Sequence, residues 1–98
     1  MDAFVPSSNS AEARRFVATS NGYLFVAGIA TTSTGTHWIV RKNPGGTGLW
    51  TTIDYYQYAV GKATEPHAMT ADAAGNLFVG GGGWDNSGTS YRWLIKKY

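Results

Sequence analysis

Three adjacent residues have the chemistry of a ligand-binding site. Trp84, Asp85 and Asn86 follow a run of four glycines. An exposed indole beside a carboxylate and an amide is the composition of a sugar-stacking site. We therefore take these three as the candidate ligand-binding residues, with a glycan as the candidate ligand. In the alternative interpretation, the Trp84 ring folds over a neighbouring sheet and only packs there.

The other polar residues do not favour catalysis or metal binding. His37 and His67 occur without any cysteine and without paired carboxylates at ligand spacing, so no zinc site is expected. Asp72 precedes the turn residues Gly75 and Asn76, and we expect its carboxylate to cap that turn. No serine has the Gly-x-Ser-x-Gly context of a nucleophile. We predict no enzymatic activity, no catalytic residue, no cofactor and no metal.

Charge and hydropathy exclude two classes of partner. The net charge of +2 over 98 residues is too small to indicate a nucleic-acid partner. No apolar run reaches the roughly 20 residues of a membrane span. Residues 1–2 lack the features of a signal peptide, so the cellular compartment is not indicated. Arg41-Lys42 and Lys96-Lys97 end similar segments, and they would form either a positive ring around an axis or solvated strand ends.

A repeat indicates which elements position these residues. Residues 22–28 return as residues 75–81, at an offset of 53 and with five of seven positions identical. Residues 37–42 match residues 92–97 at an offset of 55, after two extra residues in the second copy. A length change inside a loop, with the match resuming beyond it, is typical of a structural repeat.

Each copy of the repeat predicts a set of short antiparallel strands. We expect strands at 15–20, 23–29, 37–42 and 49–57, and again at 68–72, 76–81 and 92–98, with the second copy starting after Pro66 and a loop at 82–89. Asn21-Gly22 predicts a two-residue hairpin turn with positive φ at both positions. The apolar runs at 24–26, 38–40, 77–79 and 93–95 indicate sheets covered on both faces. Trp38 and Trp93 are then expected in the core.

The segment Pro-His-Ala-Met-Thr-Ala-Asp-Ala-Ala-Gly-Asn-Leu-Phe-Val, residues 66–79, resembles the opening of blades in bacterial β-propellers with long, NHL-like repeats. The tryptophan-containing strands at 38–41 and 50–54 are similar to later strands of such blades. The resemblance implies an all-β fold of four-stranded antiparallel blades, in a family that is often secreted. It does not imply one function, since propellers serve as enzymes, lectins and scaffolds.

The expected organisation is a single unit of two blades, residues 1–98. Residues 12–58 form blade one, and residues 59–98 form blade two without its outer strand. Residues 1–11 form a strand or linker that completes a neighbouring blade, because the aspartate and aromatic order at 2–4 is similar to that at 54–56; the alternative is a tail.

Two blades cannot close a ring, so the predicted partner is a second copy of the chain. Closed propellers have four to eight blades, which indicates a trimer or a tetramer, and we favour the trimer. The predicted function is a non-enzymatic, self-assembling propeller fragment, and the alternative is a carbohydrate-binding, lectin-like module. The residues expected at the interface between copies are Asp2, Ala3, Phe4, Val5, Trp93, Ile95 and Tyr98.

Overall fold

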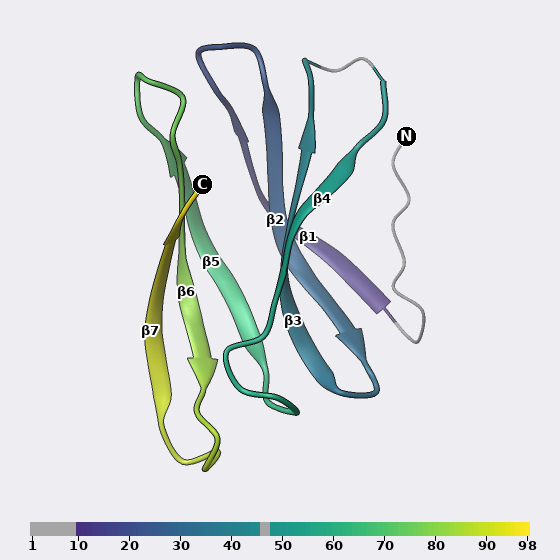
Figure 1. Ribbon diagram of the computed structural model, residues 1–98, viewed down its shortest axis with the longest axis vertical. Helices are drawn as coiled ribbons and strands as arrows, with labels where there is room; N and C mark the ends of the chain where they lie inside the picture. The colour runs from purple at the N-terminus through teal and green to yellow at the C-terminus, as the bar shows by residue number, and fades with distance from the viewer. Residues whose placement is uncertain (1–9, 46–47) are drawn as a thin grey trace.

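The computed structural model describes residues 10–45 and 48–98, which form two antiparallel sheets (Figure 1). The first sheet has the order β1-β2-β3-β4 and the second the order β5-β6-β7. The described residues contain no helix, and so none that could cross a membrane. The all-β prediction is confirmed, whereas the identity of the sheets as propeller blades stays a prediction. The strands are β1 (Ser10–Ala18), β2 (Leu24–Thr32), β3 (Gly35–Asn43), β4 (Thr51–Tyr56), β5 (Thr64–Ala71), β6 (Leu77–Trp84) and β7 (Tyr91–Lys97).

Several predicted strand boundaries are wrong. β1 begins at Ser10 and not at residue 15, and β2 continues to Thr32 and not only to residue 29. β5 begins at Thr64 and includes Pro66, because an edge strand with a bulge tolerates a residue that has no backbone N–H. β6 continues through Gly82 and Gly83 to Trp84, so the glycine run belongs to a strand and not to a loop. Glycine fits there because a Cβ at Gly82 would lie 2.1 Å from the Tyr91 ring.

The turn after β1 also differs from the prediction. Only Gly22 has positive φ, and Asn21 does not, so the turn is not the two-residue type with two left-handed residues. Thr19 N donates to Tyr23 O at 2.8 Å, which closes a longer connection that ends in a left-handed glycine. In the equivalent turn of the second sheet, Asp72 N donates to Asn76 O at 3.0 Å.

The turn-capping role predicted for Asp72 is confirmed. Its Oδ1 accepts hydrogen bonds from the backbone N–H groups of Ala74 and Asn76, at 3.0 and 2.9 Å. Hydrogen bonds from Asn76, first through its side chain, lower the pKa of Asp72. In the first sheet Thr19 Oγ1 accepts from Tyr23 N at 3.2 Å, so the two copies of the turn use different side chains for one purpose.

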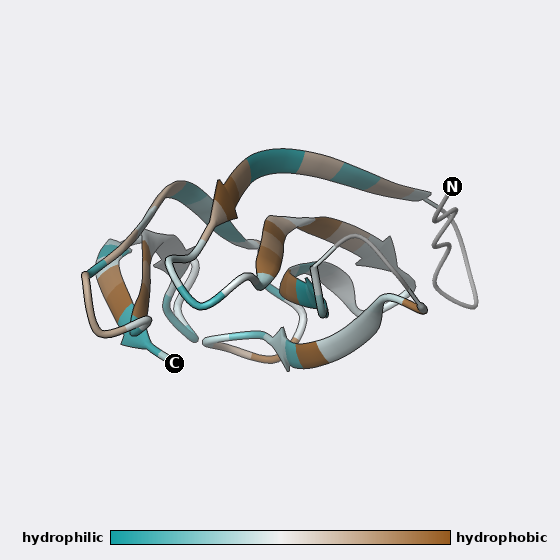
Figure 2. Cartoon of the chain, turned by 90° about the horizontal axis from the view of Figure 1, so that it is seen from above, coloured by the Kyte–Doolittle hydropathy of each residue, from teal (hydrophilic) through white to brown (hydrophobic). Residues whose placement is uncertain are grey.

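The hydrophobic core lies between the two sheets. The first sheet contributes buried side chains from β2 and β3, and the second contributes Leu77 and Val79 of β6. β5 is the strand of the second sheet that packs beside β1, β2 and β3, and in Figure 2 hydrophobic bands occur on strands of both sheets. The side chains from the first sheet are Phe25, Ala27, Trp38 and Val40.

A small polar network ties β7 to β3 and β4. Trp38 Nε1 donates to Tyr98 Oη at 3.0 Å, and Tyr98 Oη donates in turn to the Asp54 carboxylate. Lys96 Nζ pairs with Asp54 Oδ2 at 2.7 Å and lies 3.9 Å from the centre of the Tyr56 ring. Burial, and next the bond to Asp54, raise the pKa of Tyr98, so its hydroxyl stays protonated and keeps donating.

Candidate functional site

Each sheet has two faces, and the repeat shows which face of the first sheet is equivalent to which face of the second. We call the face with Trp38 in the first sheet, or Trp93 in the second, the tryptophan face. We call the opposite face, with Leu24 or Leu77, the leucine face. The tryptophan faces comprise Phe25, Ala27, Trp38 and Val40 in the first sheet and their equivalents Phe78, Gly80, Trp93 and Ile95 in the second.

Equivalent positions are buried in opposite phase in the two sheets. Along 24–27 the burial alternates half-buried, buried, half-buried, buried, and along 77–80 it alternates buried, half-buried, buried, half-buried. The core therefore forms between the tryptophan face of the first sheet and the leucine face of the second. Because the two sheets use opposite faces, one tryptophan face and one leucine face are left at the two ends of the stack.

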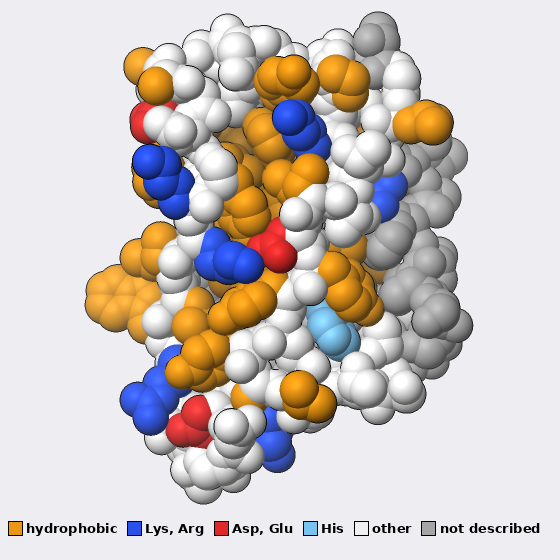
Figure 3. All heavy atoms as spheres, in the orientation of Figure 1, with side chains coloured by type: hydrophobic (Ala, Val, Ile, Leu, Met, Phe, Trp, Pro, Cys, Tyr) orange, Lys and Arg blue, Asp and Glu red, His pale blue; other side chains and the backbone are white. Residues whose placement is uncertain are grey.

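The tryptophan face of the second sheet is largely exposed. Trp93 is 85% exposed, whereas its equivalent Trp38 is 0% exposed. Ile95 is also exposed, and Figure 3 shows hydrophobic side chains projecting outward beyond β7. The prediction that Trp38 is core is confirmed. The same prediction for Trp93 is wrong for the single chain, because no described residues pack over the outer face of its sheet.

The leucine face of the first sheet is exposed in part, since Ile39 and Ala30 on this face are buried while aromatic side chains beside them are exposed. Phe16 pairs with Val26 across β1 and β2 and is 61% exposed. Tyr55 pairs with Ile39 across β3 and β4 and is exposed as well. Leu24 and Val26 are half-buried. This chain thus has apolar surface on the outer faces of both sheets, which is the pattern of an interaction surface.

Matching β-bulges occur in the first strands of the two sheets. The register shifts between Ala13 and Arg15 in β1, and between Pro66 and Ala68 in β5. Arg14 and His67 are thus the extra residues of equivalent bulges, at an offset of 53. A bulge re-aims its side chain out of the regular alternation, and bulges are common beside functional sites.

Glycine on the partner strand makes each bulge possible. A Cβ placed on Gly28 would lie 2.0 Å from Glu12 O, and a Cβ on Gly81 would lie 2.0 Å from Glu65 O. No side chain fits at either position while the bulged backbone is this close. The two glycines are themselves equivalent, so the repeat preserves the bulge together with the residue that permits it.

An ion pair joins the sheets at the first bulge. Arg14 Nη1 lies 2.9 Å from Glu65 Oε1, and Arg14 Nε lies 3.5 Å from Glu12 Oε1. The side chains of Arg14 and Glu65 are 29% and 28% exposed, whereas that of Glu12 is 64% exposed. Arg14 therefore bridges a half-buried carboxylate of the other sheet and a solvated carboxylate of its own.

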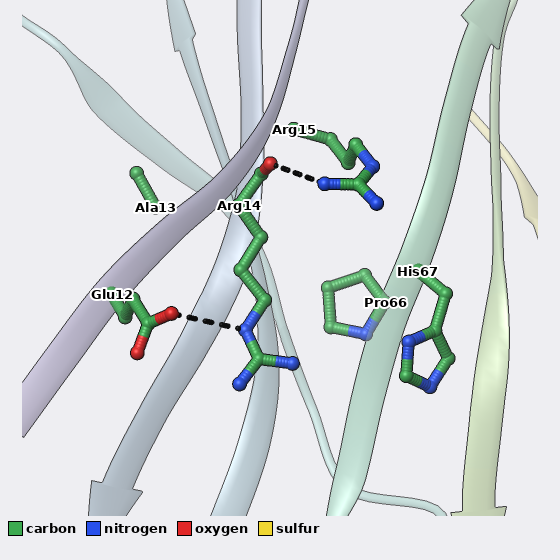
Figure 4. A pocket seen from close by; sticks show the side chains of 6 residues that line it. All are labelled: Glu12, Ala13, Arg14, Arg15, Pro66 and His67. Carbon is green, nitrogen blue, oxygen red and sulfur yellow. Dashed lines mark hydrogen bonds and ion pairs between the residues drawn. The ribbon is translucent and has the colours of Figure 1, made fainter.

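An open groove of about 310 Å³ runs between β1 and β5 at the bulges (Figure 4). The Arg14 guanidinium lies between the two strands, and Arg15 Nη1 donates to Arg14 O at 2.9 Å. His67 on β5 is exposed, and its Nε2 lies 3.1 Å from Tyr91 Oη. Burial, and secondarily the charge of Glu65, raise the pKa of Tyr91, so its hydroxyl stays protonated at neutral pH.

The predicted ligand-binding residues lie at the start of the β6–β7 connection. Trp84 is 38% exposed and makes an edge-to-face contact with Tyr91, with ring centres 5.1 Å apart, which confirms the predicted partial exposure. Asp85 accepts from Ser87 Oγ at 2.5 Å, and this bond, foremost among several, lowers the pKa of Asp85. Asn86 is exposed. The Asp85 carboxylate thus holds its own loop, and the structure does not bring it to the groove.

The remaining predicted residues fall in two places. Asp2, Ala3, Phe4 and Val5 lie outside the described residues. Tyr98 contacts Trp38 and Asp54 of its own chain, so these contacts already occupy its hydroxyl. Among residues 10–45 and 48–98, no three histidine or acidic side chains gather as a metal site.

The groove was not predicted from the sequence, although one signal was available. Glu12 and Glu65 match at the repeat offset, and so do Gly28 and Gly81. A glycine inside a strand run often marks a bulge, and two equivalent ones would have located both. The pairing of Arg14 with Glu65 joins residues 51 apart and has no local signal.

Comparison of the chain with protein-family models, curated proteins and solved structures finds no match.

Proposed function

We propose that this chain is a non-enzymatic β-propeller fragment that self-associates head to tail into a closed ring. Each of its sheets acts as one blade, and each joint places the tryptophan face of the second sheet on the leucine face of the first sheet of the next copy. A trimer gives six blades, within the four to eight of closed propellers. The contact is heterologous, so it closes when the rotation per copy divides a full turn.

The observation that carries this proposal is the unequal burial of equivalent tryptophans. Trp38 is buried because a leucine face covers it, and Trp93, at the same position of the repeat, is 85% exposed. The first sheet offers a leucine face on which Phe16 is exposed, Leu24 and Val26 are half-buried, and Ile39 is buried. The chain therefore has, at its two ends, the two surfaces that already fit each other at its centre.

A second arrangement would bury the same tryptophan in a different way. Two copies could pack tryptophan face to tryptophan face, as a two-fold dimer in which the same patch meets itself. That arrangement covers Trp93 and leaves the leucine face of the first sheet exposed. The internal packing favours the head-to-tail joint, because the sheets in the chain meet through unlike faces.

Blocking one face at a time distinguishes these arrangements. Ile95→Asp places a charge on the tryptophan face of the second sheet, and Phe16→Asp does so on the leucine face of the first. Ala73→Asp, at an exposed turn position, is the matched control and should assemble like the wild type. We expect each face variant alone to be monomeric by light scattering.

Mixing the two face variants gives the decisive result. One joint remains possible between the intact leucine face of Ile95→Asp and the intact tryptophan face of Phe16→Asp, so the mixture should form a heterodimer. If Phe16→Asp instead dimerises alone while Ile95→Asp is monomeric, the joint is two-fold and the ring proposal fails. If both variants assemble like the control, neither face is used.

Glycan binding is the second candidate function. The favouring observation is that Trp84 keeps an accessible ring beside exposed Asn86. A glycan array probed with the wild type and with Trp84→Ala tests it. A glycan retained by the wild type and lost by Trp84→Ala supports a lectin-like role. Binding of no glycan, or equal binding by both proteins, removes this candidate.

A further inference from the structure

The two sheets of the chain are joined at their first strands by Arg14 and Glu65, and the repeat gives each of these residues a counterpart. His67 occupies the bulge position of Arg14 in the second sheet, and Glu12 occupies the position of Glu65 in the first. The Arg14 and Glu65 side chains are mostly covered, whereas Glu12 and His67 are exposed. The exposed counterparts thus lie on opposite sheets, as the two apolar faces do.

We propose that His67 of one copy pairs with Glu12 of the next copy across the joint, and that this pair makes assembly depend on pH. The inference rests on the head-to-tail ring proposed above. It follows from applying the internal joint to the external one. In the internal joint, Arg14 is the bulge residue of the first sheet and reaches the Glu65 carboxylate of the second sheet, with Arg14 Nη1 and Glu65 Oε1 2.9 Å apart.

The external joint has His67 at the bulge position where the internal joint has Arg14, and this difference changes how the joint responds to pH. An arginine stays charged throughout the physiological range, so the pair inside the chain is permanent. Histidine side chains gain or lose their charge between about pH 5 and 8, whereas carboxylates are ionised in that range. The external joint therefore has its ion pair at the low end of this range and lacks it at the high end.

Other charged and titratable groups surround His67 and set the background of this response. On its own strand Glu65 lies two residues away, but it is engaged by Arg14. From β7, Tyr91 Oη lies 3.1 Å from His67 Nε2 and stays protonated. From β1, Glu12, Arg14 and Arg15 line the same groove. Assembly adds one group to this set, the Glu12 carboxylate of the next copy, which in its own chain also lies 3.5 Å from Arg14 Nε.

The direction of the effect follows from proton linkage. If the charged imidazole is stabilised in the ring, assembly takes up protons, and association is tighter at pH 5.5 than at pH 8. An exposed ion pair contributes about a two- to fivefold change in equilibrium constant for each joint. A closed trimer has three joints, so its overall association constant should change by about tenfold to a hundredfold.

The test measures association by analytical ultracentrifugation at pH 5.5 and pH 8 for four proteins. The wild type should show the change. His67→Arg, which copies the internal joint, should assemble equally well at both pH values and more tightly than the wild type at pH 8. His67→Ala and Glu12→Gln should lose the response, and His67→Ala retains His37, so it excludes that histidine as the sensor. Circular dichroism spectra confirm that each variant is folded.

Three results would overturn the inference. Equal association of the wild type at both pH values means that the pair does not form, although the ring proposal survives. A response that persists in His67→Ala assigns the sensor to another group. Absence of assembly at either pH refutes the ring and this inference together.

Discussion

Replacing Trp93 and Trp38 by alanine, one at a time, should give opposite phenotypes at equivalent positions of the repeat. Trp38 is 0% exposed within the chain and Trp93 is 85% exposed. If the outer face of the second sheet is a joint, Trp93→Ala weakens assembly and leaves the fold of the single chain intact. Trp38→Ala instead destabilises the chain itself.

The magnitude for Trp93 follows from its exposed area. A tryptophan contributes about 200 Å², so 85% exposure leaves about 170 Å² to be covered. At about 25 cal/mol per Å², covering it contributes about 4 kcal/mol, of which an alanine methyl keeps about 0.8. Trp93→Ala should therefore cost about 3 kcal/mol for each joint, or about a hundredfold in its association constant.

The magnitude for Trp38 comes from core truncation. Removing a buried tryptophan side chain costs about 3–5 kcal/mol, which is much of the stability of a small domain. For a domain of this size, that loss lowers the melting temperature by at least about 12 °C.

Two assays separate the phenotypes. Light scattering across a dilution series reports assembly, and thermal melting at a concentration where the chain is monomeric reports its own stability. Trp93→Ala should weaken assembly in light scattering and leave the melting temperature of the monomer unchanged. The reasoning is refuted if Trp93→Ala lowers the monomer melting temperature as much as Trp38→Ala, or if it assembles as tightly as the wild type.

Three further perturbations test the packing and the ends of the chain. Gly81→Ala should lower the free energy of unfolding by about 3 kcal/mol or more in chemical denaturation, because its Cβ would lie 2.0 Å from the Glu65 carbonyl oxygen. Gly80→Ala is the control and should be close to neutral, since its nearest backbone oxygen is 4.0 Å away, and equal losses in the two variants would contradict the bulge geometry. Tyr98→Phe should cost about 1–3 kcal/mol in the same assay by leaving the buried Trp38 N–H without its acceptor, and an unchanged midpoint would argue against that bond. Deleting residues 1–5 should weaken assembly or cause aggregation, because we expect them to pair with β7 of a neighbouring copy. An unchanged mass and melting temperature would show that they are a tail.

The repeat predicts much of the fold because the strands and turns that it relates depend on neighbouring residues in the sequence. The strand around Phe25 and that around Phe78 follow from matching apolar runs, and the turn at Asp72 follows from its own side chain. The errors at Pro66 and in the glycine run occur where a long-range contact overrides local preference. Pro66 lies in an edge strand at a bulge, and Gly82 gives room to the Tyr91 ring.

The site is less predictable because it depends on which sheet covers which face. Trp38 and Trp93 have similar sequence surroundings, and only the second sheet packed on the first makes them differ. Similarly, nothing next to Arg14 in the sequence indicates that its partner is Glu65, 51 residues away. The repeat relates positions to each other, but the three-dimensional order of the sheets decides which member of each pair is exposed.

The mass of the chain in solution tests the central claim most directly. Three chains of 10.5 kDa each would close a six-blade ring, so native mass spectrometry and light scattering should show a single species of about 32 kDa. That species should persist on dilution until the joints dissociate. A stable, compact species of 10.5 kDa at every concentration would contradict the account.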